Sequence, residues 1–229
     1  MSLQHSTRRS SALLGAGLFS LGVFQAHAGA SLLVDDASIT AHGHCQVESW
    51  IRAHSPGQEL TSVPACNAAG IEFGLGYSHY TQAGTGNLWS LAAKHLFRDF
   101  DTQPWGLGLS VNAGWDGNAG RWTNGSVNLP LSIALDPDRK AVLHLNIGWS
   151  KPEAQPAALT GGIGSEWVLG PSWTLLAEMY AVHRGPTLAQ LGLRHALSNA
   201  TSLDVLAGHQ RGQQGGSWLT LGLNFDFPR

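Results

Sequence analysis

The chain closes on Trp218-Leu-Thr-Leu-Gly-Leu-Asn-Phe-Asp-Phe227, with only Pro228 and Arg229 after it. Leucine and phenylalanine alternate here with threonine, glycine, asparagine and aspartate. Successive side chains of a β-strand point to opposite faces, so this period of two predicts a strand with one apolar and one polar face. A soluble β-sandwich and a membrane-spanning β-barrel can both end on such a strand, and the rest of the chain decides between them.

The spacing of Thr220, Gly222, Phe225 and Phe227 resembles the C-terminal signal by which Gram-negative outer-membrane barrels are recognised for assembly. The resemblance implies the β-barrel assembly machinery as a partner of this chain. Outer-membrane lipid and lipopolysaccharide are the further partners expected of such a barrel.

The N-terminus has the features of a secretory signal peptide over residues 1–28. Arg8 and Arg9 form a positive region, an apolar stretch follows, and Ala26-His27-Ala28 offers a cleavage site between small residues. We therefore expect export to the outer membrane, a periplasmic N-terminal segment over 29–43 and a barrel over 44–229. The segment 29–43 could instead enter the lumen of the barrel.

The composition limits the class of protein. The chain of 229 residues carries a formal net charge of −2, 29 glycines and nine tryptophans. Its basic residues are few and scattered, which argues against nucleic-acid binding. After the signal peptide no stretch approaches the roughly 18 consecutive apolar residues of a transmembrane helix.

Turn residues divide the rest of the chain into strand-length blocks. We expect a closed antiparallel all-β barrel of twelve strands with short turns on both sides. The predicted strands are 44–54, 57–66, 70–81, 87–98, 104–115, 120–133, 140–150, 157–168, 171–182, 187–195, 201–210 and 216–227. The second block contains Pro64 and alternates poorly, so ten strands with a long first loop is the alternative.

Charge is confined to one parity of these strands, and the other parity carries aliphatic and aromatic residues in the strand centres. A lipid-facing charge near the midplane costs about 2–4 kcal/mol, so this segregation favours a membrane barrel with a charged lumen. The residues predicted to line the lumen are Glu48, Arg52, Glu72, Lys94, Glu166, Glu178, Arg194 and Asp204.

Aromatic residues gather at strand ends, as in the girdles of membrane barrels, which a sandwich has no reason to show. One girdle is predicted from Trp89, Trp115, Trp122, Trp149 and Trp218. The other is predicted from Phe97, Trp105, Trp167, Trp173, Phe225 and Phe227.

Cys45 and Cys66 are the only cysteines of an exported chain, which predicts a disulfide. Cys45 begins the first predicted strand and Cys66 ends the second, so both lie at the same rim. Because the Cα atoms of a disulfide lie within about 7 Å, the bridge favours twelve strands over ten.

Several spaced residues carry a resemblance to a family. They are Leu33-Val34-Asp35-Asp36-Ala37, Cys45-Gln46-Val47-Glu48-Ser49-Trp50, Cys66, Glu72-Phe73-Gly74-Leu75-Gly76, Lys94 and Glu178-Met179-Tyr180. The chain resembles a group of uncharacterised proteobacterial outer-membrane barrels, similar in layout to the MetA-pathway-like family named after phenol degradation. The resemblance implies a barrel and, for the broader family, passage of apolar solutes.

We expect a narrow channel or binding barrel for small solutes. Its inward charges would act as a selectivity ring or as ion pairs between strands. A structural barrel with a sealed lumen is the alternative, and an outer-membrane lipid esterase is a weaker one. His195 and Ser198 lie three residues apart, whereas the His-x-Ser-Asn stretch of outer-membrane lipid A deacylases has them two apart. His144 and Asn146 share a face as in the outer-membrane phospholipase pattern, but no serine is placed to complete a triad. We therefore predict no catalytic residue, no metal site and no cofactor.

Overall fold

Twelve antiparallel strands make up the computed structural model, which describes residues 31–54, 57–81, 86–153, 155–211 and 216–228. The strands are β1 (His44–His54), β2 (Gln58–Ala68), β3 (Ile71–Tyr80), β4 (Gly86–Arg98), β5 (Trp105–Asp116), β6 (Arg121–Ala134), β7 (Ala141–Pro152), β8 (Ala158–Val168), β9 (Trp173–Val182), β10 (Thr187–Ala196), β11 (Thr201–Arg211) and β12 (Gly216–Pro228). Each is paired with its neighbours in sequence.

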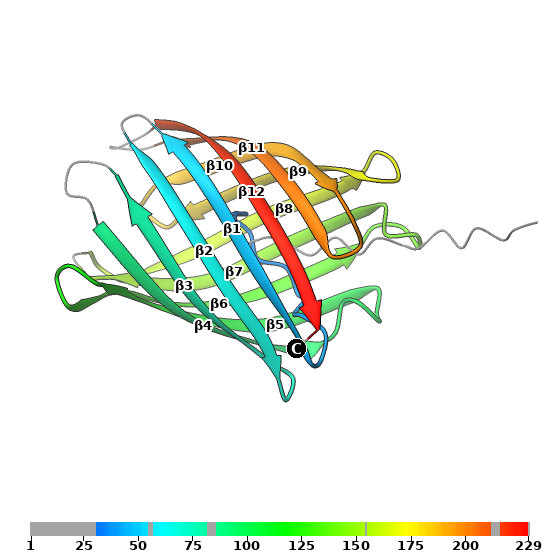
Figure 1. Ribbon diagram of the computed structural model, residues 1–229, viewed down its shortest axis with the longest axis horizontal. Coiled ribbons are helices and arrows are strands. Elements are labelled where there is room, and N and C mark those ends of the chain that lie inside the picture. The colour runs from blue at the N-terminus through cyan, green and yellow to red at the C-terminus, as the bar shows by residue number, and fades with distance from the viewer. Residues whose placement is uncertain (1–30, 55–56, 82–85, 154, 212–215, 229) are drawn as a thin grey trace, which may run out of the picture.

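The barrel closes where β1 pairs with β12, from His44 opposite Pro228 to His54 opposite Trp218 (Figure 1). Closure leaves no unpaired strand edge, which a sheet in hydrocarbon requires. The end where β1 starts and β12 stops is called the terminal rim below, and the opposite end the distal rim.

The twelve predicted strands are confirmed, each to within two residues at either end. The ten-strand alternative is wrong, because the block with the poor alternation is β2. Pro64 has no backbone N–H, and the ladder between β2 and β3 lacks pairs at Val63 and Pro64 while keeping its register on both sides. Proline therefore weakens this strand locally without ending it.

A two-residue turn joins β2 to β3 at the terminal rim. Ala69 and Gly70 both have positive φ, at 56° and 81°. Two successive positive values match the turn geometry that follows the twist of paired strands. Glycine suits the second position because a side chain there would be strained.

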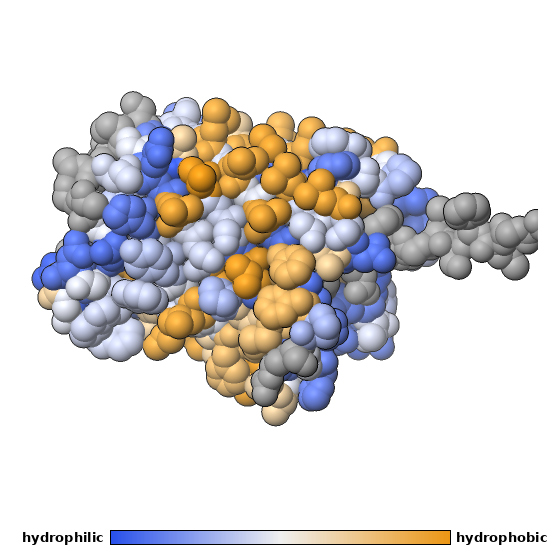
Figure 2. Space-filling view, viewed as in Figure 1, coloured by the Kyte–Doolittle hydropathy of each residue, from blue (hydrophilic) through white to orange (hydrophobic). Residues whose placement is uncertain are grey.

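The outward parity is apolar, as the sequence predicts. Figure 2 shows hydrophobic side chains over the middle of the visible face and hydrophilic ones gathered at the left end. Tryptophans of both predicted girdles point outward and are 41–55% exposed: Trp89, Trp105, Trp122, Trp149, Trp167 and Trp173. No helix of the described ranges has the length and apolar character needed to cross a membrane.

Trp218 corrects the girdle prediction. Its side chain points into the barrel and is only 8% exposed, and its indole N–H donates to Gln190 at 3.3 Å. It shares the inward parity of Thr220 and Gly222, which the alternation of β12 requires. Residue type suggested the membrane interface, whereas strand parity sets the direction of the side chain.

The predicted disulfide between Cys45 and Cys66 is confirmed, with Cα atoms 4.0 Å apart. The two residues are directly opposite each other on β1 and β2 at the terminal rim. The bridge therefore ties together the first two strands next to the point where residues 31–43 join the barrel.

Candidate functional site

Residues 31–43 are called the plug segment below. Residues 31–40 lie inside the barrel, and Ala41 and His42 are exposed at its terminal rim. Figure 1 shows this segment in dark blue, enclosed by the strands. Ala37 is completely buried, Val34 is 2% exposed and Ser31 1%. Of the two placements that the sequence left open, the structure has the lumen for residues 31–40. The predicted signal peptide, 1–28, lies outside the described residues.

The first residue of the plug segment, Ser31, contacts inward residues of β1, β10, β11 and β12. Ser31 Oγ donates to Asp204 Oδ2 at 3.3 Å. The carbonyl oxygen of Ser31 accepts from Gln190 Nε2 and from Arg52 Nη2, both at 3.2 Å. A Cβ at Gly222 would lie 3.1 Å from Ser31 Oγ, so this glycine leaves room for the segment.

Glu178 on β9 holds the next part of the plug segment. Its carboxylate accepts from the backbone N–H of Leu33 at 3.1 Å and of Val34 at 3.0 Å. Gly162 and Gly164 on the neighbouring β8 face Val34, and a Cβ at either would approach it to 3.0–3.2 Å. The inward glycines of β8 thus form a slot for an apolar side chain.

Lys94 on β4 binds two successive carboxylates. Its Nζ lies 2.7 Å from Asp35 Oδ1 and 2.8 Å from Asp36 Oδ1. Ser110 Oγ donates to the other oxygen of Asp35 at 3.0 Å. The Lys94 side chain is 11% exposed, and an ammonium group so far from water needs its anionic partners.

The side-chain amide of Asn146 on β7 hydrogen-bonds both main-chain groups of Asp35. Its Oδ1 accepts from the N–H of Asp35 at 2.8 Å, and its Nδ2 donates to the carbonyl of the same residue at 2.7 Å. Asn128 Nδ2 also donates to Asn146 Oδ1, at 2.9 Å, which fixes the direction of the amide. One side chain therefore pairs with both main-chain groups of one residue, as a neighbouring strand would.

Ala37 lies on a buried polar chain. Its N–H donates to Ser132 Oγ at 2.8 Å, and Ser132 Oγ is 2.8 Å from His144 Nδ1. His144 Nε2 faces Glu166 Oε1 at 3.7 Å, beyond hydrogen-bond distance. The serine that sequence reasoning did not find for His144 is Ser132, directly opposite it on β6. It is fully buried beneath the plug segment.

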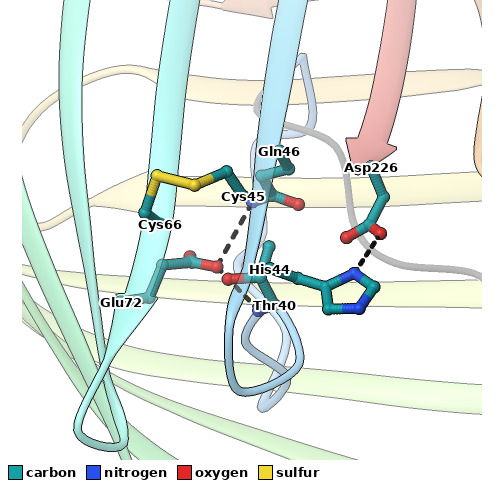
Figure 3. Close-up of a disulfide and its surroundings, with 7 residues drawn as sticks. All are labelled: Thr40, His44, Cys45, Gln46, Cys66, Glu72 and Asp226. Atoms are coloured by element: carbon teal, nitrogen blue, oxygen red, sulfur yellow. Dashed lines mark hydrogen bonds and ion pairs between the residues drawn. A yellow bond between two sulfur atoms is a disulfide. The ribbon is translucent and has the colours of Figure 1, made fainter. Parts of the chain in front are cut away.

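The plug segment leaves the lumen at the terminal rim (Figure 3). The N–H of Thr40 donates to Glu72 Oε2 at 2.7 Å, and Asn67 Nδ2 donates to the Thr40 carbonyl at 2.7 Å. The chain then turns at Gly43, where φ is +77°, and enters β1. His44 Nδ1 lies 2.8 Å from Asp226 of β12, so both strands that close the barrel are tied beside this turn.

The charged residues predicted for the lumen all lie on the inward parity. Glu72, Lys94 and Glu178 contact the plug segment directly, and Arg52 and Asp204 contact it through Ser31. Arg194, Asp204 and Glu166 form an ion-pair cluster within the wall, with Arg194 Nε 2.7 Å from Asp204 and its Nη1 4.0 Å from Glu166. Glu48 is buried on the inward face of β1.

Arg52 lies outside that cluster and pairs with Glu59 at 3.6 Å, a buried acid that the sequence analysis missed because it lies in the poorly alternating β2. Trp50 Nε1 also donates to Glu59, at 2.9 Å. Asn146, Ser132 and Gln190 were missed too, since uncharged residues on an inward parity give no signal in sequence.

On β7 and β11 the inner wall becomes more exposed toward the distal rim. On β7, Val142, His144 and Asn146 are 8%, 5% and 9% exposed, whereas Gly148 and Ser150 further along the same face are half-buried. The same change occurs on β11, after Asp204 and Leu206. On these two strands the plug segment therefore covers the terminal part of the inner wall. Near the distal rim, Glu59, Thr61 and Trp218 are buried in contacts with other residues of the wall.

The residues considered for catalysis do not form an esterase site. His195 Nδ1 lies 3.2 Å from the carbonyl of Ser172, and Ser198 Oγ accepts from the N–H of Ala200. Ser132 and His144 are in contact, but Ser132 accepts the Ala37 N–H and is fully buried beneath the plug segment. No cluster of three metal-ligating side chains occurs within the described ranges.

The family model described as "Uncharacterised conserved protein UCP029691" matches residues 18–227, and the chain belongs to this family. A search among curated proteins gives no match.

Solved structures with a similar fold are outer-membrane barrels. The KdgM porin in complex with disordered oligogalacturonate superposes with a TM-score of 0.62 at 10% identity, covering 80% of this chain and 99% of the porin. The NanC porin gives 0.62 at 10% identity, with 79% and 98% covered. The outer-membrane protein Omp33 of Acinetobacter baumannii gives 0.55 at 8% identity, with 82% and 100% covered. At these identities the likeness shows a shared porin-type barrel fold.

Proposed function

We propose that this chain is an outer-membrane channel for small solutes, closed at rest by its own plug segment. The observation that carries the proposal is the seat of the segment: Lys94 binds Asp35 and Asp36, and the glycines of β8 leave a slot for Val34. A wall that served only to seal the barrel would have no need of glycines, because large side chains fill small barrels by themselves.

The apolar exterior and the outward tryptophans support a place in the outer membrane. The likeness of the barrel to the KdgM and NanC porins supports solute passage. A relation in layout to the MetA-pathway-like barrels belongs to the proposal and rests on the residues named for that resemblance. Export by a cleaved signal peptide over 1–28 belongs to the same proposal. The terminal rim then faces the periplasm, and the distal half of the lumen opens to the outside.

Recognition by the assembly machinery remains part of the proposal. Phe225 and Phe227 point outward, as such a signal needs, while Thr220 and Gly222 point inward. Thr220 Oγ1 accepts from Arg52 Nε at 3.2 Å, and Gly222 leaves room for Ser31. These two positions therefore also serve the closed lumen. We infer further that the barrel is not an enzyme and that outer-leaflet lipid, lipopolysaccharide included, surrounds it.

The test is single-channel conductance in planar bilayers. The full-length variant D35K/D36K places two cations against Lys94 and should release the plug segment, because like charges at this distance repel strongly in a site with little water. We expect steady current from this variant and from K94M, and a nearly silent wild type. The variant D138K/E153K, with the same charge change at exposed turns, should remain as silent as the wild type.

Folding of each variant is checked by its heat-dependent shift in electrophoretic mobility. The channel would be overturned if no current passed through D35K/D36K, K94M or the triple variant D35K/D36K/K94M, all correctly folded. A sealed structural barrel would then be the remaining interpretation.

A further inference from the structure

The wall of the lumen holds the plug segment chiefly by its main chain. Main-chain N–H groups of Leu33, Val34 and Asp35 donate to Glu178 and Asn146, and those of Ala37 and Thr40 to Ser132 and Glu72. Main-chain carbonyls of Ser31, Asp35 and Thr40 accept from Gln190, Arg52, Asn146 and Asn67. Every peptide carries these groups, so the wall is complementary to the main chain of any peptide that can follow the bent path of residues 31–40.

Asn146 gives this complementarity its sharpest form. Its amide bonds both the N–H and the C=O of Asp35, at 2.8 Å and 2.7 Å, and Asn128 holds the amide in that direction. A donor and an acceptor on one residue is the pattern by which an extended peptide pairs with a strand. A sugar acid carries the carboxylate for Lys94 but has no alternating N–H and C=O groups.

Two side-chain positions add a preference in sequence. Lys94 and Ser110 bind the carboxylate of Asp35, and Lys94 also binds Asp36. The slot over Gly162 and Gly164 holds Val34, which directly precedes Asp35 and Asp36 in the sequence. The wall therefore favours a peptide in which an apolar residue is followed by acidic residues.

We propose that short acidic peptides are the solutes of this barrel, and that the plug segment occupies their binding site as a tethered competitor. This rests on the channel function proposed above. When the plug segment leaves, Glu178, Asn146 and Lys94 lose these partners together. A peptide such as acetyl-Val-Asp-Asp restores the contacts of Asn146 and Lys94 and the one that Glu178 makes with the N–H of Val34. Partners left buried and unpaired are costly, which favours a ligand that satisfies them.

The experiment is block of the current through the full-length D35K/D36K variant. The probes are the acetylated tripeptides Val-Asp-Asp and Val-Asn-Asn, and galacturonate as a carboxylate without peptide bonds. We expect acetyl-Val-Asp-Asp to block at a concentration at least about tenfold lower than either of the other two, because it alone satisfies Lys94 and Asn146 together.

Variants in the same background separate the contacts. N146L should raise the half-blocking concentration of acetyl-Val-Asp-Asp about tenfold, since two hydrogen bonds are lost, and should leave that of galacturonate unchanged. K94M should weaken block by both. The matched control is N112L, an inward asparagine on β5 that is two residues beyond Ser110 toward the distal rim.

Equal block by galacturonate and the acidic tripeptide, insensitive to N146L, would overturn the proposal and show that the lumen reads carboxylates alone. If D35K/D36K, K94M and the triple variant D35K/D36K/K94M all pass no current, the channel function fails by itself. Isothermal titration calorimetry of acetyl-Val-Asp-Asp against D35K/D36K in detergent then decides peptide recognition. Binding that N146L abolishes supports it, and the absence of binding overturns it.

Discussion

The two halves of the lumen are built from the same strands and differ in what their inward residues contact. In the terminal half, buried acids, amides and Lys94 meet the plug segment, and hardly any inward side chain is exposed. In the distal half, Gly148 and Ser150 are half-buried, and a Cβ at Gly148 would meet Thr160 and Asn128 of the wall rather than the plug segment. Strand alternation decides which residues point inward, but a second segment of chain decides which of them are buried.

The largest expected effect comes from breaking the buried pair of Arg194 and Asp204. D204N leaves the guanidinium group, 4% exposed, without its closest charge and should lower the free energy of unfolding by about 3–5 kcal/mol. E59Q breaks the longer and less buried pair with Arg52 and should cost about 1 kcal/mol. Urea unfolding in lipid vesicles, followed by tryptophan fluorescence, measures both. Equal losses would show that the two halves do not differ in this respect.

The disulfide comes next. C45S/C66S removes a bridge that closes a loop of 21 residues and should cost about 2–4 kcal/mol by the chain-entropy account. Both cysteines are on the outward parity of β1 and β2, away from the plug contacts, so the variant should stay as silent in bilayers as the wild type. Reducing agent should lower the urea midpoint of the wild type and leave that of C45S/C66S unchanged. Steady current from the variant would tie the bridge to the closed state of the lumen.

A smaller effect is expected from one added methyl group. G164A places a Cβ 3.2 Å from Val34, and overpacking of this kind costs about 1–3 kcal/mol. Because the plug segment can move and the strand cannot, the cost should appear as more frequent channel opening. G74A adds the same group where its nearest neighbours lie at 3.6–3.7 Å and none belongs to the plug segment. If G74A opens the channel as often as G164A, the slot has no part in closure.

The smallest effect concerns acid at the terminal rim. Backbone N–H groups, that of Lys140 foremost, donate to the exposed carboxylate of Asp136 and hold its pKa below the usual 3.8. A depressed folded-state pKa adds stability above pH 3.8, and this contribution is lost as the pH falls through the lower folded value. We expect D136N to flatten the pH dependence of unfolding slightly below pH 4, and D138N, in the same turn, to change it less. Identical profiles for wild type and D136N would contradict this.

The fold was open to prediction because each of its parts is local. Strand parity, turn residues and the two cysteines need only neighbouring residues, and all twelve strands follow from them. Trp218 shows the limit: its residue type favoured the girdle, although its own parity pointed inward.

The plug segment was not predictable in the same way. Residues 31–43 have no alternation, and their partners are far away in sequence, 145 positions for Leu33 and Glu178 and 111 for Asp35 and Asn146. Lys94 and Glu178 were identified as inward charges, but their binding partner emerges only when closure brings β4 and β9 around one lumen. The pairing of Ser132 with His144 likewise depends on the register between β6 and β7.

The direct connection between the plug segment and β1 fixes an order of events in folding. Asp204, Glu178, Asn146 and Lys94 come from strands that surround the lumen only after β12 has paired with β1. Contacts of such long sequence separation form late, because the chain must first lose the entropy of the intervening loops. We therefore expect residues 31–37 to dock last in folding, so that a filled lumen is a sign that the barrel is complete.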